Sequence, residues 1–450
     1  MSRDPQAAKR ALTVLHVSAE DGSGGAARAA YRVHRSLADL PQEHGVRSSM
    51  LVARKHTDDP SVDTIETSPS RELATRAIAK FAAQERRLIR TPNPVLHSTA
   101  RVPTAALRRI EQLNPDVVVL HWLGSRTMSI RQIGRLLAGR RPVAWRFPDT
   151  WAFCGAEHYP HGEADTRFVD GYRRDNRLKG ERGPDLNRRT WIRKRRHWTQ
   201  PAQIVAPSRW MAGLANRSAL MGSWPTQVIS NPLDTEWWGA VSRSEARARL
   251  GIPQDRHVVL FGAVGGERDP RKGADLLRRA LPRVVERMAA AEGAAPDLLT
   301  FGGPPGVDRV AGITVRSVGR LDDEGLRLHY SAADVMVVPS RQEAFGQTAS
   351  EAITCGTPVV AFAVGGLPDI VEDRVNGRLV PPFDIEQLAE AIAWVISDPE
   401  RHARLSAAAR ERAARWDKRE VGAQYADLLS DLVAATRLPN GRAENHESLP

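Results

Sequence analysis

Residues 333–363 read ADVMVVPSRQEAFGQTASEAITCGTPVVAFA, and this stretch predicts a strand, a loop, a short helix and a second strand. ADVMVVPS is the first apolar strand, and Arg341 to Gln347 form the loop at its carboxyl end. The helix that follows is stopped by Gly356, and TPVVAFA is the next strand. Short apolar runs separated by helical patterning are typical of parallel strands that are buried on both faces.

The same pattern occurs in both halves of the chain. A chain of 450 residues is too long for one typical domain. We therefore predict an α/β fold with two doubly wound, Rossmann-like domains that face a central cleft. A basic helix is expected from about Ala274 to Ala290. The remaining strands are expected at residues 12–18, 48–53, 116–122, 142–147 and 202–208 in the first half and at 257–263, 297–303 and 313–319 in the second.

The domain boundaries follow from breaks in this pattern. The first domain is expected at 1–227, and an Asn-Pro pair marks a linker at 228–253. The second domain is expected at 254–412, followed by a helix at 413–436 that crosses back to the first domain. The tail at 437–450 has little apolar content, which predicts disorder.

The charge of the chain favours anionic partners. The sequence holds 65 Lys and Arg against 53 Asp and Glu, a net charge of +12. Residues 173–197 alone hold eleven Lys or Arg against three acids. Three interpretations of this basic stretch stay open: a solvated surface, contact with an anionic membrane or a lipid-phosphate acceptor, and contact with nucleic acid.

The sequence gives no support for a membrane span or a secretory signal. No run of about 18 apolar residues occurs, and the first ten residues, MSRDPQAAKR, are polar. Cys154 and Cys355 are the two cysteines, one in each half, which argues against a disulfide framework and a thiolate zinc site. We expect a cytoplasmic protein, with peripheral contact at the inner face of the cell membrane as a further hypothesis.

Two carboxylates, Glu343 and Glu351, flank the loop and the helix start in the opening stretch. In open α/β sheets ligands bind outside the carboxyl ends of the strands. The first N–H groups of the helix can receive phosphate, and Gly346 lets a ligand approach the backbone. Because a carboxylate repels phosphate, the two glutamates are better suited to sugar hydroxyls. This predicts a ligand with hydroxyls at both ends and phosphates between them.

A basic loop supports this prediction. In GGERDPRKGADLL, Arg268, Arg271 and Lys272 follow the strand at 257–263, again at a carboxyl end. Cations at this place can neutralise a pyrophosphate. The alternative is a basic helix start left in solvent, which is disfavoured because positive charge opposes the helix dipole at that end.

These residues resemble the GT-B glycosyltransferases, specifically the family 4 group of retaining enzymes that use nucleotide sugars. The resemblance covers about residues 11–435 and rests mainly on the block PSRQEAFGQTASEAITCGTPVVAFAVGGLPDIV at 339–371. RKG, NPLD and the glycine loop GSGGAARAA also fit the family.

The resemblance implies roles for the donor residues. Glu351 would hold the ribose hydroxyls, and Glu343 would contact the donor sugar or the leaving phosphate region. Lys272 would stabilise the charge on the departing diphosphate, with help from Arg268 or Arg271. The remaining donor-binding residues would be Gly24 and Gly25, which line the phosphate side, and Phe345, Gly346 and Gln347, whose backbone faces sugar and phosphate.

The stretch WRFPDTWAFCGAEHY at 145–159 resembles a motif of a subgroup that makes bacterial surface polysaccharides. That subgroup often has a His before the Asp, whereas this chain has Pro148, so no catalytic His is assigned here. Asp149 stays a catalytic candidate. The acceptor-binding candidates are His121, Asp149, Trp151, His158 and Tyr159, and a structural role is the alternative for His121, Trp151 and Tyr159.

The sequence therefore predicts a glycosyltransferase that moves a sugar from a nucleotide-diphosphate sugar to a glycan or lipid-linked hydroxyl with retention, in lipopolysaccharide or exopolysaccharide synthesis. We expect no cofactor and no metal, since no obvious Asp-x-Asp motif occurs. A GT-B epimerase of nucleotide sugars, and a basic membrane- or nucleic-acid-binding protein that retains the fold, are the alternatives. The sequence does not reveal the nucleotide base, the donor sugar, the acceptor, the linkage or the oligomeric state.

Overall fold

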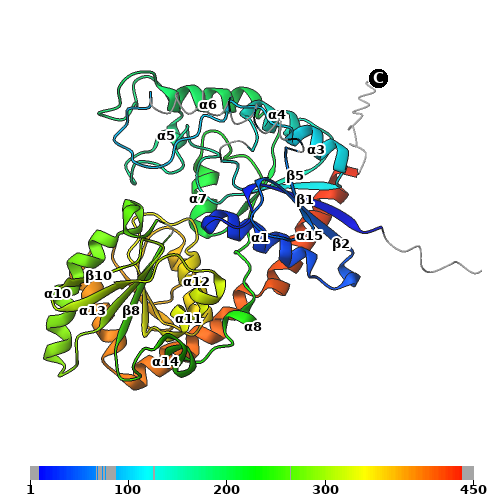
Figure 1. Cartoon of the computed structure of the whole chain (residues 1–450). Coiled ribbons are helices and arrows are strands. Elements are labelled where there is room, and N and C mark those ends of the chain that lie inside the picture. The colour runs from blue at the N-terminus through cyan, green and yellow to red at the C-terminus, as the bar shows by residue number, and fades with distance from the viewer. Residues whose placement is uncertain are drawn as a thin grey trace, which may run out of the picture.

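The computed structural model of the protein describes residues 10–437, apart from residues 67, 69–72, 74–76, 78–87, 125–126 and 264 and the side chain of Gln42. The described chain contains two seven-stranded sheets. Figure 1 shows them in two lobes, the first coloured from blue to green and the second from green to orange. The predicted disordered tail at 437–450 lies, except for Arg437, outside the described residues.

The first sheet is entirely parallel in its described pairs and has the order β3-β2-β1-β4-β5-β6-β7. Its first strand along the chain lies in the middle of the sheet, as in doubly wound folds. The strands are β1 Leu12–Glu20, β2 Val46–Arg54, β3 Val62–Thr64, β4 Val117–Leu120, β5 Val143–Arg146, β6 Gln203–Ala206 and β7 Thr226–Val228.

The second sheet repeats this order as β10-β11-β9-β8-β12-β13-β14, with one antiparallel pair, β10 and β11. The prediction of two doubly wound α/β domains is confirmed. The strands are β8 Val258–Gly262, β9 Asp297–Phe301, β10 Gly306–Val310, β11 Ile313–Ser317, β12 Val335–Val338, β13 Val359–Phe362 and β14 Gly377–Val380.

The four strands that the sequence pattern did not reveal are β3, β7, β10 and β14. All four lie at an edge of their sheet. An edge strand is covered on fewer sides than a central one, so it needs no continuous apolar run. β10, for example, is exposed at four of its five positions.

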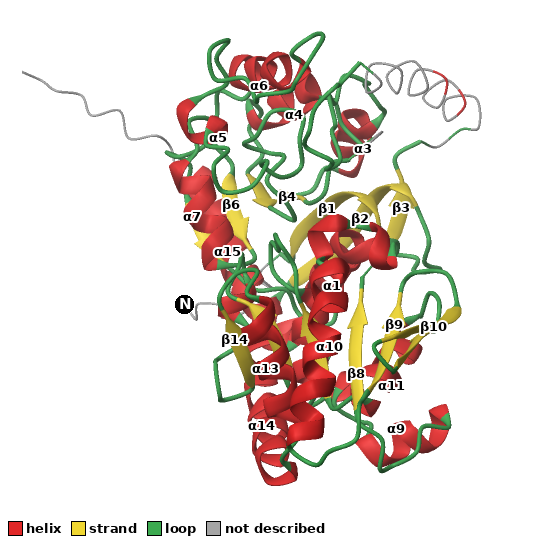
Figure 2. Cartoon of the chain, turned by 90° about the vertical axis from the view of Figure 1, so that its left-hand side faces the viewer, coloured by secondary structure: helices red, strands yellow, loops and turns green. Residues whose placement is uncertain are grey.

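Helices cover both faces of each sheet, as Figure 2 shows in red against yellow strands. The helix expected from about Ala274 to Ala290 is found there as α10. In the first half the helices are α1 Gly24–Ala38, α3 Ala106–Leu113, α4 Ile130–Leu137, α5 Arg167–Asp170, α6 Leu186–His197, α7 Arg209–Arg217, α8 Thr235–Trp238 and α9 Arg243–Leu250. In the second half they are α10 Ala274–Ala290, α11 Asp323–Ala332, α12 Gln347–Thr354, α13 Ile385–Ile396, α14 Pro399–Arg412 and α15 Lys418–Arg437.

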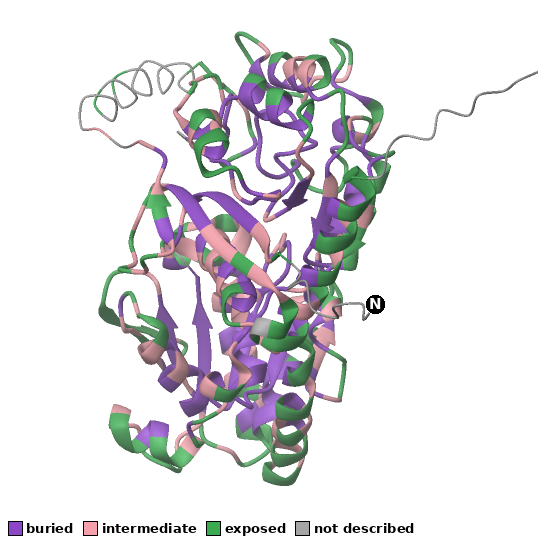
Figure 3. Ribbon diagram, turned by 90° about the vertical axis from the view of Figure 1, so that its right-hand side faces the viewer, coloured by how far each residue is buried: buried purple, intermediate pink, exposed green. Residues whose placement is uncertain are grey.

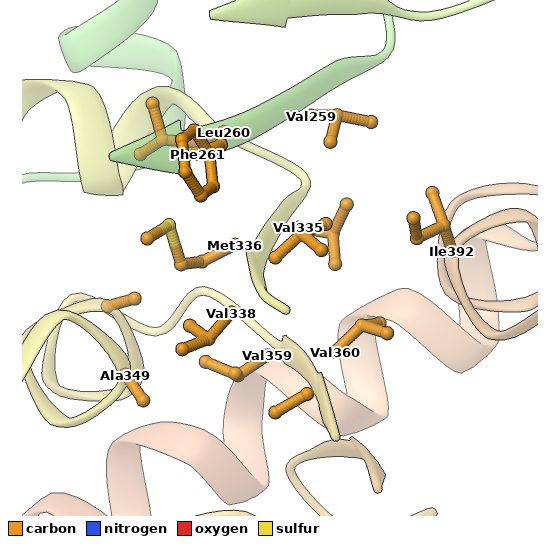
Figure 4. Packing of buried hydrophobic residues seen from close by; sticks show 14 of the residues in the cluster. Val259, Leu260, Phe261, Val335, Met336, Val338, Ala349, Val359, Val360 and Ile392 are labelled. Atoms are coloured by element: carbon orange, nitrogen blue, oxygen red, sulfur yellow. The ribbon is translucent and has the colours of Figure 1, made fainter. Parts of the chain in front are cut away.

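The central strands form the core of each domain. Figure 3 shows the strands largely in purple, for buried residues, while the outward faces of the helices are green. In the second domain, Val259 of β8, Met336 of β12 and Val360 of β13 belong to one buried cluster. Figure 4 shows these side chains between Ala349 of α12 and Ile392 of α13. The core thus holds the start of α12, and the loop before it, against the strand ends.

The last helix, α15, follows the second domain in sequence but packs on the first. It lies against α1, as Figure 1 also shows. Its residues Val421 and Leu429 share a buried cluster with Val14 of β1 and Val33 of α1. The segment at 228–253 carries α8 and α9, and α9 packs on α11 of the second domain.

The packing of α15 predicts a clear difference between two neighbouring leucines. Leu429 is fully buried, whereas Leu428 is only partly buried. Leu429→Ala leaves a cavity under the sheet and should lower the free energy of unfolding of the first domain by about 2–5 kcal/mol. Leu428→Ala is the matched control and should cost clearly less. Urea unfolding followed by tryptophan fluorescence measures both, and equal losses would contradict the packing described here.

Candidate functional site

A cavity of about 630 Å³ lies between the two domains, at the carboxyl ends of strands from both sheets. This is the position at which doubly wound folds bind ligands. From the first domain it is lined by segments that follow β1 and β5, and from the second by segments that follow β8, β9 and β12. The predicted site residues on its wall are Gly24, Gly25, Asp149, His158, Tyr159, Arg271, Lys272, Glu343, Phe345, Gly346, Gln347 and Glu351.

The start of α12 faces this cavity with free backbone donors. Its cap residue, Gly346, has φ +109° and gives no side-chain cap. A Cβ at Gly346 would lie 2.8 Å from the side chain of Leu367, so both the backbone angle and the packing require glycine. The amide groups of Gln347 and Thr348 donate to no described group. This helix start can therefore bind an anion.

A Lys and a Glu meet beside the start of α12. Lys272 Nζ lies 2.5 Å from Glu343 Oε2, and their side chains are 23% and 12% exposed. Ser340 also donates to this carboxylate oxygen, at 3.4 Å. The pair keeps the ammonium group at the cavity wall, and Glu343 retains its other oxygen for a ligand.

Gly273 lets the basic loop approach the strand end. Residues Pro270–Lys272 form a 3₁₀ turn, and Gly273 follows it with φ +70°. A Cβ on Gly273 would lie 1.8 Å from the carbonyl oxygen of Pro339, just beyond β12. Lys272 reaches Glu343 because the chain can pass this close to the end of β12.

Arg271 connects the two walls of the cavity. Its guanidinium lies over the ring of Tyr159, 4.8 Å from the ring centre, and pairs with Asp269 at 2.5 Å. Burial alone would lower the pKa of Arg271, but Tyr159, Asp269 and Glu343 outweigh it and raise that pKa. Burial raises the pKa of Tyr159, so its hydroxyl stays protonated. Of the two arginines expected to assist Lys272, Arg271 lines the cavity. Arg268 is exposed and does not line it.

Glu351 is held by groups from both domains. Tyr330 donates from its hydroxyl to Oε2 at 3.0 Å, and Arg32 of α1 donates to Oε1 at 2.7 Å. Burial and the neighbouring Glu351 raise the pKa of Tyr330 well above its usual value, so its hydroxyl remains a donor. The sequence did not reveal Arg32 or Tyr330 as part of the site.

Asp149 stands on the first-domain wall with its carboxylate fixed by three donors. Trp122 Nε1 lies 3.0 Å and His158 Nδ1 2.6 Å from Oδ2, while the amide of Trp151 donates to Oδ1 at 2.9 Å. The other ring nitrogen of His158 lies 2.9 Å from Ser98 Oγ. This network holds a rigid hydrogen-bond acceptor opposite the basic loop.

Two predicted acceptor residues, His121 and Trp151, do not line the cavity. His121 is buried against His16, with 2.9 Å between ring nitrogens. Burial, followed by Arg146, lowers its pKa well below the usual value. Successive side chains of an extended chain point to opposite faces, so its neighbour Trp122 lines the cavity instead. Trp151 is likewise a core residue, whose indole donates to the carbonyl of Ser98 at 2.9 Å.

The cavity wall also contains a buried arginine, Arg146, which the sequence analysis did not identify because it ends an apolar strand. Arg146 closes β5 and is 2% exposed. Both of its described hydrogen bonds go to the neutral Asn231 of the NPLD motif, at 3.2 and 2.5 Å, and no described carboxylate pairs with it. Burial lowers the pKa of Arg146. A charged residue within an otherwise apolar strand was the available signal.

The basic stretch at 173–197 is not uniformly a surface. Lys194 is fully buried, and its ammonium group donates to the carbonyls of Trp151, Cys154 and Gly155 and lies 4.0 Å from the ring centre of Trp151. Burial lowers its pKa to about 7. Lys194 thus supports the chain that follows Asp149. The exposed basic side chains of the stretch are Arg173, Arg174, Lys179, Arg182, Arg189, Arg195 and Arg196.

Other expected features concern metals, thiols and membranes. Within the described residues, no three His, Cys, Asp or Glu side chains gather closely enough to hold a metal ion. Cys154 and Cys355 are both buried and unbridged. No helix in the described part of the chain is long and apolar enough to cross a membrane.

Comparison with known proteins finds a family match within the second half of the chain. The family of glycosyl transferases group 1 matches residues 242–412. A D-inositol 3-phosphate glycosyltransferase from Saccharomonospora viridis is 39% identical over 224 residues, which cover 47% of this chain and 51% of the relative. The chain spans about half the length of the curated relatives it matches.

Solved structures match nearly the whole chain. A sucrose-phosphate synthase from Thermosynechococcus elongatus has a TM-score of 0.64 at 21% identity and covers 95% of this chain and 100% of its own. The Anabaena protein HepE, solved with UDP-glucose, has a TM-score of 0.58 at 17% identity and covers 93% of this chain and 100% of its own. The predicted GT-B fold is thereby confirmed.

The close approach at Gly273 predicts a sensitive position in the basic loop. Gly273→Ala combines a positive φ with a clash against Pro339 and should cost at least about 2 kcal/mol of unfolding free energy in the second domain. Gly213→Ala in α7 is the matched control, since its Cβ would meet open space. That control should be neutral or slightly stabilising, because alanine favours helices. Thermal unfolding distinguishes them; a stable Gly273→Ala would show that the loop is not constrained.

Proposed function

We propose that this chain, whose residues 242–412 match the family of glycosyl transferases group 1, transfers a sugar from a nucleotide-diphosphate sugar to an acceptor hydroxyl with retention of configuration. The observation that carries the proposal is the joining of Lys272 and Arg271 with the free start of α12 on one wall of a cavity between the domains. Two cations and a helix start suit a diphosphate. Glu343 and Glu351 on the same wall suit the hydroxyls of the sugar and the ribose.

The residues suggest how the transfer proceeds. As the bond between the anomeric carbon and the diphosphate oxygen breaks, Lys272 and Arg271 stabilise the charge that develops on the leaving group. The acceptor oxygen bonds to the same face of the sugar, and its proton passes to the leaving phosphate. The fixed carboxylate of Asp149 accepts a hydrogen bond from the acceptor and orients it. No step in this scheme uses a metal ion or a further cofactor.

The acceptor side favours a molecule that carries an anionic group. Arg146 is buried on the first-domain wall with no described carboxylate partner, and a buried charge is costly unless it is paired. A phosphate or carboxylate on the acceptor would supply that partner. A lipid-linked saccharide phosphate in cell-surface polysaccharide synthesis meets this requirement. A phosphorylated polyol also meets it, in line with the relatives that are named for D-inositol 3-phosphate.

A peripheral contact with an anionic membrane is also proposed, through the exposed arginines of α6. A hollow of about 1360 Å³ on the first domain adjoins this helix, and its wall includes Arg131, Arg135 and Arg140. These three side chains are exposed, as are Arg195 and Arg196. A surface of this kind is attracted to anionic lipid within a Debye length.

The donor assignment predicts which substitutions stop turnover. With UDP-, GDP- and ADP-sugars, one donor should release its nucleotide in the presence of EDTA. Lys272→Ala and Glu343→Ala should each lower that rate about 100-fold or more, because each removes a charge at the reacting centre. Arg268→Ala, an exposed arginine of the same loop, should keep the wild-type rate.

The assay uses coupled nucleotide release, with phosphorylated and neutral sugars and inositol phosphate as acceptors. Full activity of both Lys272→Ala and Glu343→Ala would contradict the donor assignment. A changed nucleotide sugar formed without any acceptor would instead identify an epimerase. Loss of activity in EDTA that added Mg²⁺ restores would contradict metal independence.

The membrane contact predicts a charge-dependent binding to vesicles. Arg195→Glu with Arg196→Glu should weaken binding to vesicles that contain phosphatidylglycerol several-fold, and more so at low salt. Lys194 is left unchanged because it is buried. Arg309→Glu with Arg316→Glu, exposed on β10 and β11 of the second domain, makes the same charge change as a control. Vesicle sedimentation measures binding, and equal behaviour of both double variants would rule out α6 as the contact.

A further inference from the structure

Arg32 carries a charge from the first domain into the donor side of the second. It lies in the third turn of α1, and its Nη1 is 2.7 Å from Glu351 Oε1. The side chains of Arg32 and Glu351 are 14% and 4% exposed. The two residues are separated by 319 positions in sequence, so their meeting depends wholly on how the domains pack.

The guanidinium of Arg32 is supported from a third segment. It lies over the ring of Trp238, 5.3 Å from the ring centre. Trp238 ends α8, the short helix between the two sheets, and is 2% exposed. Its ring also packs against Tyr330, with 6.1 Å between the ring centres. The orientation of Arg32 is therefore set by the first domain, the connecting segment and the second domain together.

The ion pair forms where the two domains touch. Two contacts near it also join α1 and its start to the second domain: Arg28 pairs with Asp323 at 3.0 Å, and Gln347 donates to the carbonyl of Gly25 at 2.9 Å. A buried carboxylate is costly without a counter-charge. If the domains separated, Arg32 would leave with α1, and Glu351 would keep only the hydroxyl of Tyr330.

The hydrogen bonds of Glu351 leave room for a ligand. An ionised carboxylate has about four acceptor positions. In the described structure, Arg32 uses one on Oε1 and Tyr330 uses one on Oε2. About two positions remain, one on each oxygen, and the cis hydroxyls of a ribose present two donors. The contacts of Arg32 and Tyr330 thus set the direction in which the remaining lone pairs point.

We propose that Arg32 is a positioning residue of the donor site, which orients Glu351 toward the ribose hydroxyls and makes ribose recognition depend on the closed arrangement of the two domains. This inference rests on the proposed function, because it takes Glu351 as the group that binds the ribose. It adds Arg32 to Gly24 and Gly25 as a residue that the first domain contributes to the donor site.

The experiment compares a nucleotide with its 2′-deoxy form. The probe is whichever of UDP, GDP or ADP binds the wild-type chain most tightly, together with dUDP, dGDP or dADP. The wild type should bind the deoxy form about 10- to 100-fold more weakly, the effect of losing one hydrogen bond to a charged group. Arg32→Gln should reduce that ratio to about 2 or less, because Glu351 is no longer oriented. Arg32→Lys, which keeps the charge, should recover part of the ratio. Calorimetry gives both affinities.

Two matched controls carry the same substitution at other arginines. Arg209→Gln removes an exposed pair with Asp369 that also joins the domains, at 2.7 Å. Arg35→Gln changes the next turn of α1, where Arg35 pairs with Asp39 and Asp59 inside the first domain. Both controls should keep the wild-type ratio, and thermal unfolding checks that every variant is folded.

Each result decides the proposal. The proposal is supported if Arg32→Gln loses the preference for the nucleotide over its 2′-deoxy form and both control variants keep it. A variant that weakens both nucleotides equally, or leaves the ratio intact, overturns it, because Arg32 would then serve domain packing only. If Arg32→Gln binds neither nucleotide, Arg32→Lys decides: a wild-type ratio in that variant overturns the positioning role, and a reduced ratio supports it. If the wild type binds the nucleotide and its 2′-deoxy form equally well, the ribose role of Glu351 is overturned. If the wild type binds no nucleotide, the proposed function itself is refuted.

Discussion

Two carboxylates at the edge of one cavity depend on two cations that lie beside them. Glu343 and Glu351 are 12% and 4% exposed in their side chains, and neither could be ionised cheaply at such a place without a counter-charge. Lys272 supplies the charge for Glu343 from the same domain, while Arg32 supplies it for Glu351 from the other domain. The position of the basic loop and the closeness of the two domains both follow from this requirement.

Further contacts between the domains hold the loop that carries Glu343. Ser208, at the start of α7, donates to the carbonyl of Ala344 at 2.7 Å, and Gln342 donates to the carbonyl of Pro160 at 3.0 Å. Both contacts hold the loop between β12 and α12 against the first domain. That loop includes Glu343, so the contacts between the domains also fix the geometry of the proposed donor side. The site we propose is complete only where the domains meet.

On the first-domain wall of the cavity, buried polar groups hold one another in place. Three donors hold the carboxylate of Asp149, and Lys194 holds the chain that follows it through three carbonyl groups. Such fully partnered groups are rigid, since moving any of them would leave a buried donor or acceptor unpaired. Arg146 differs because a neutral side chain is its only described partner. This difference is why we look to the acceptor for a negative charge.

The sequence by itself determined the central strands, the two doubly wound halves and the loops that carry Lys272, Glu343 and Asp149. It could do so because strands buried on both faces need continuous apolar runs, and because ligands of such sheets lie at the carboxyl ends of the strands. It did not determine the edge strands, which lack this constraint, or the directions of His121 and Trp122, which differ by a single position along the chain. The pair of Arg32 and Glu351 was decided by the tertiary structure alone. No local pattern relates two residues 319 positions apart, and only the packing of α1 against the second domain brings their charges together.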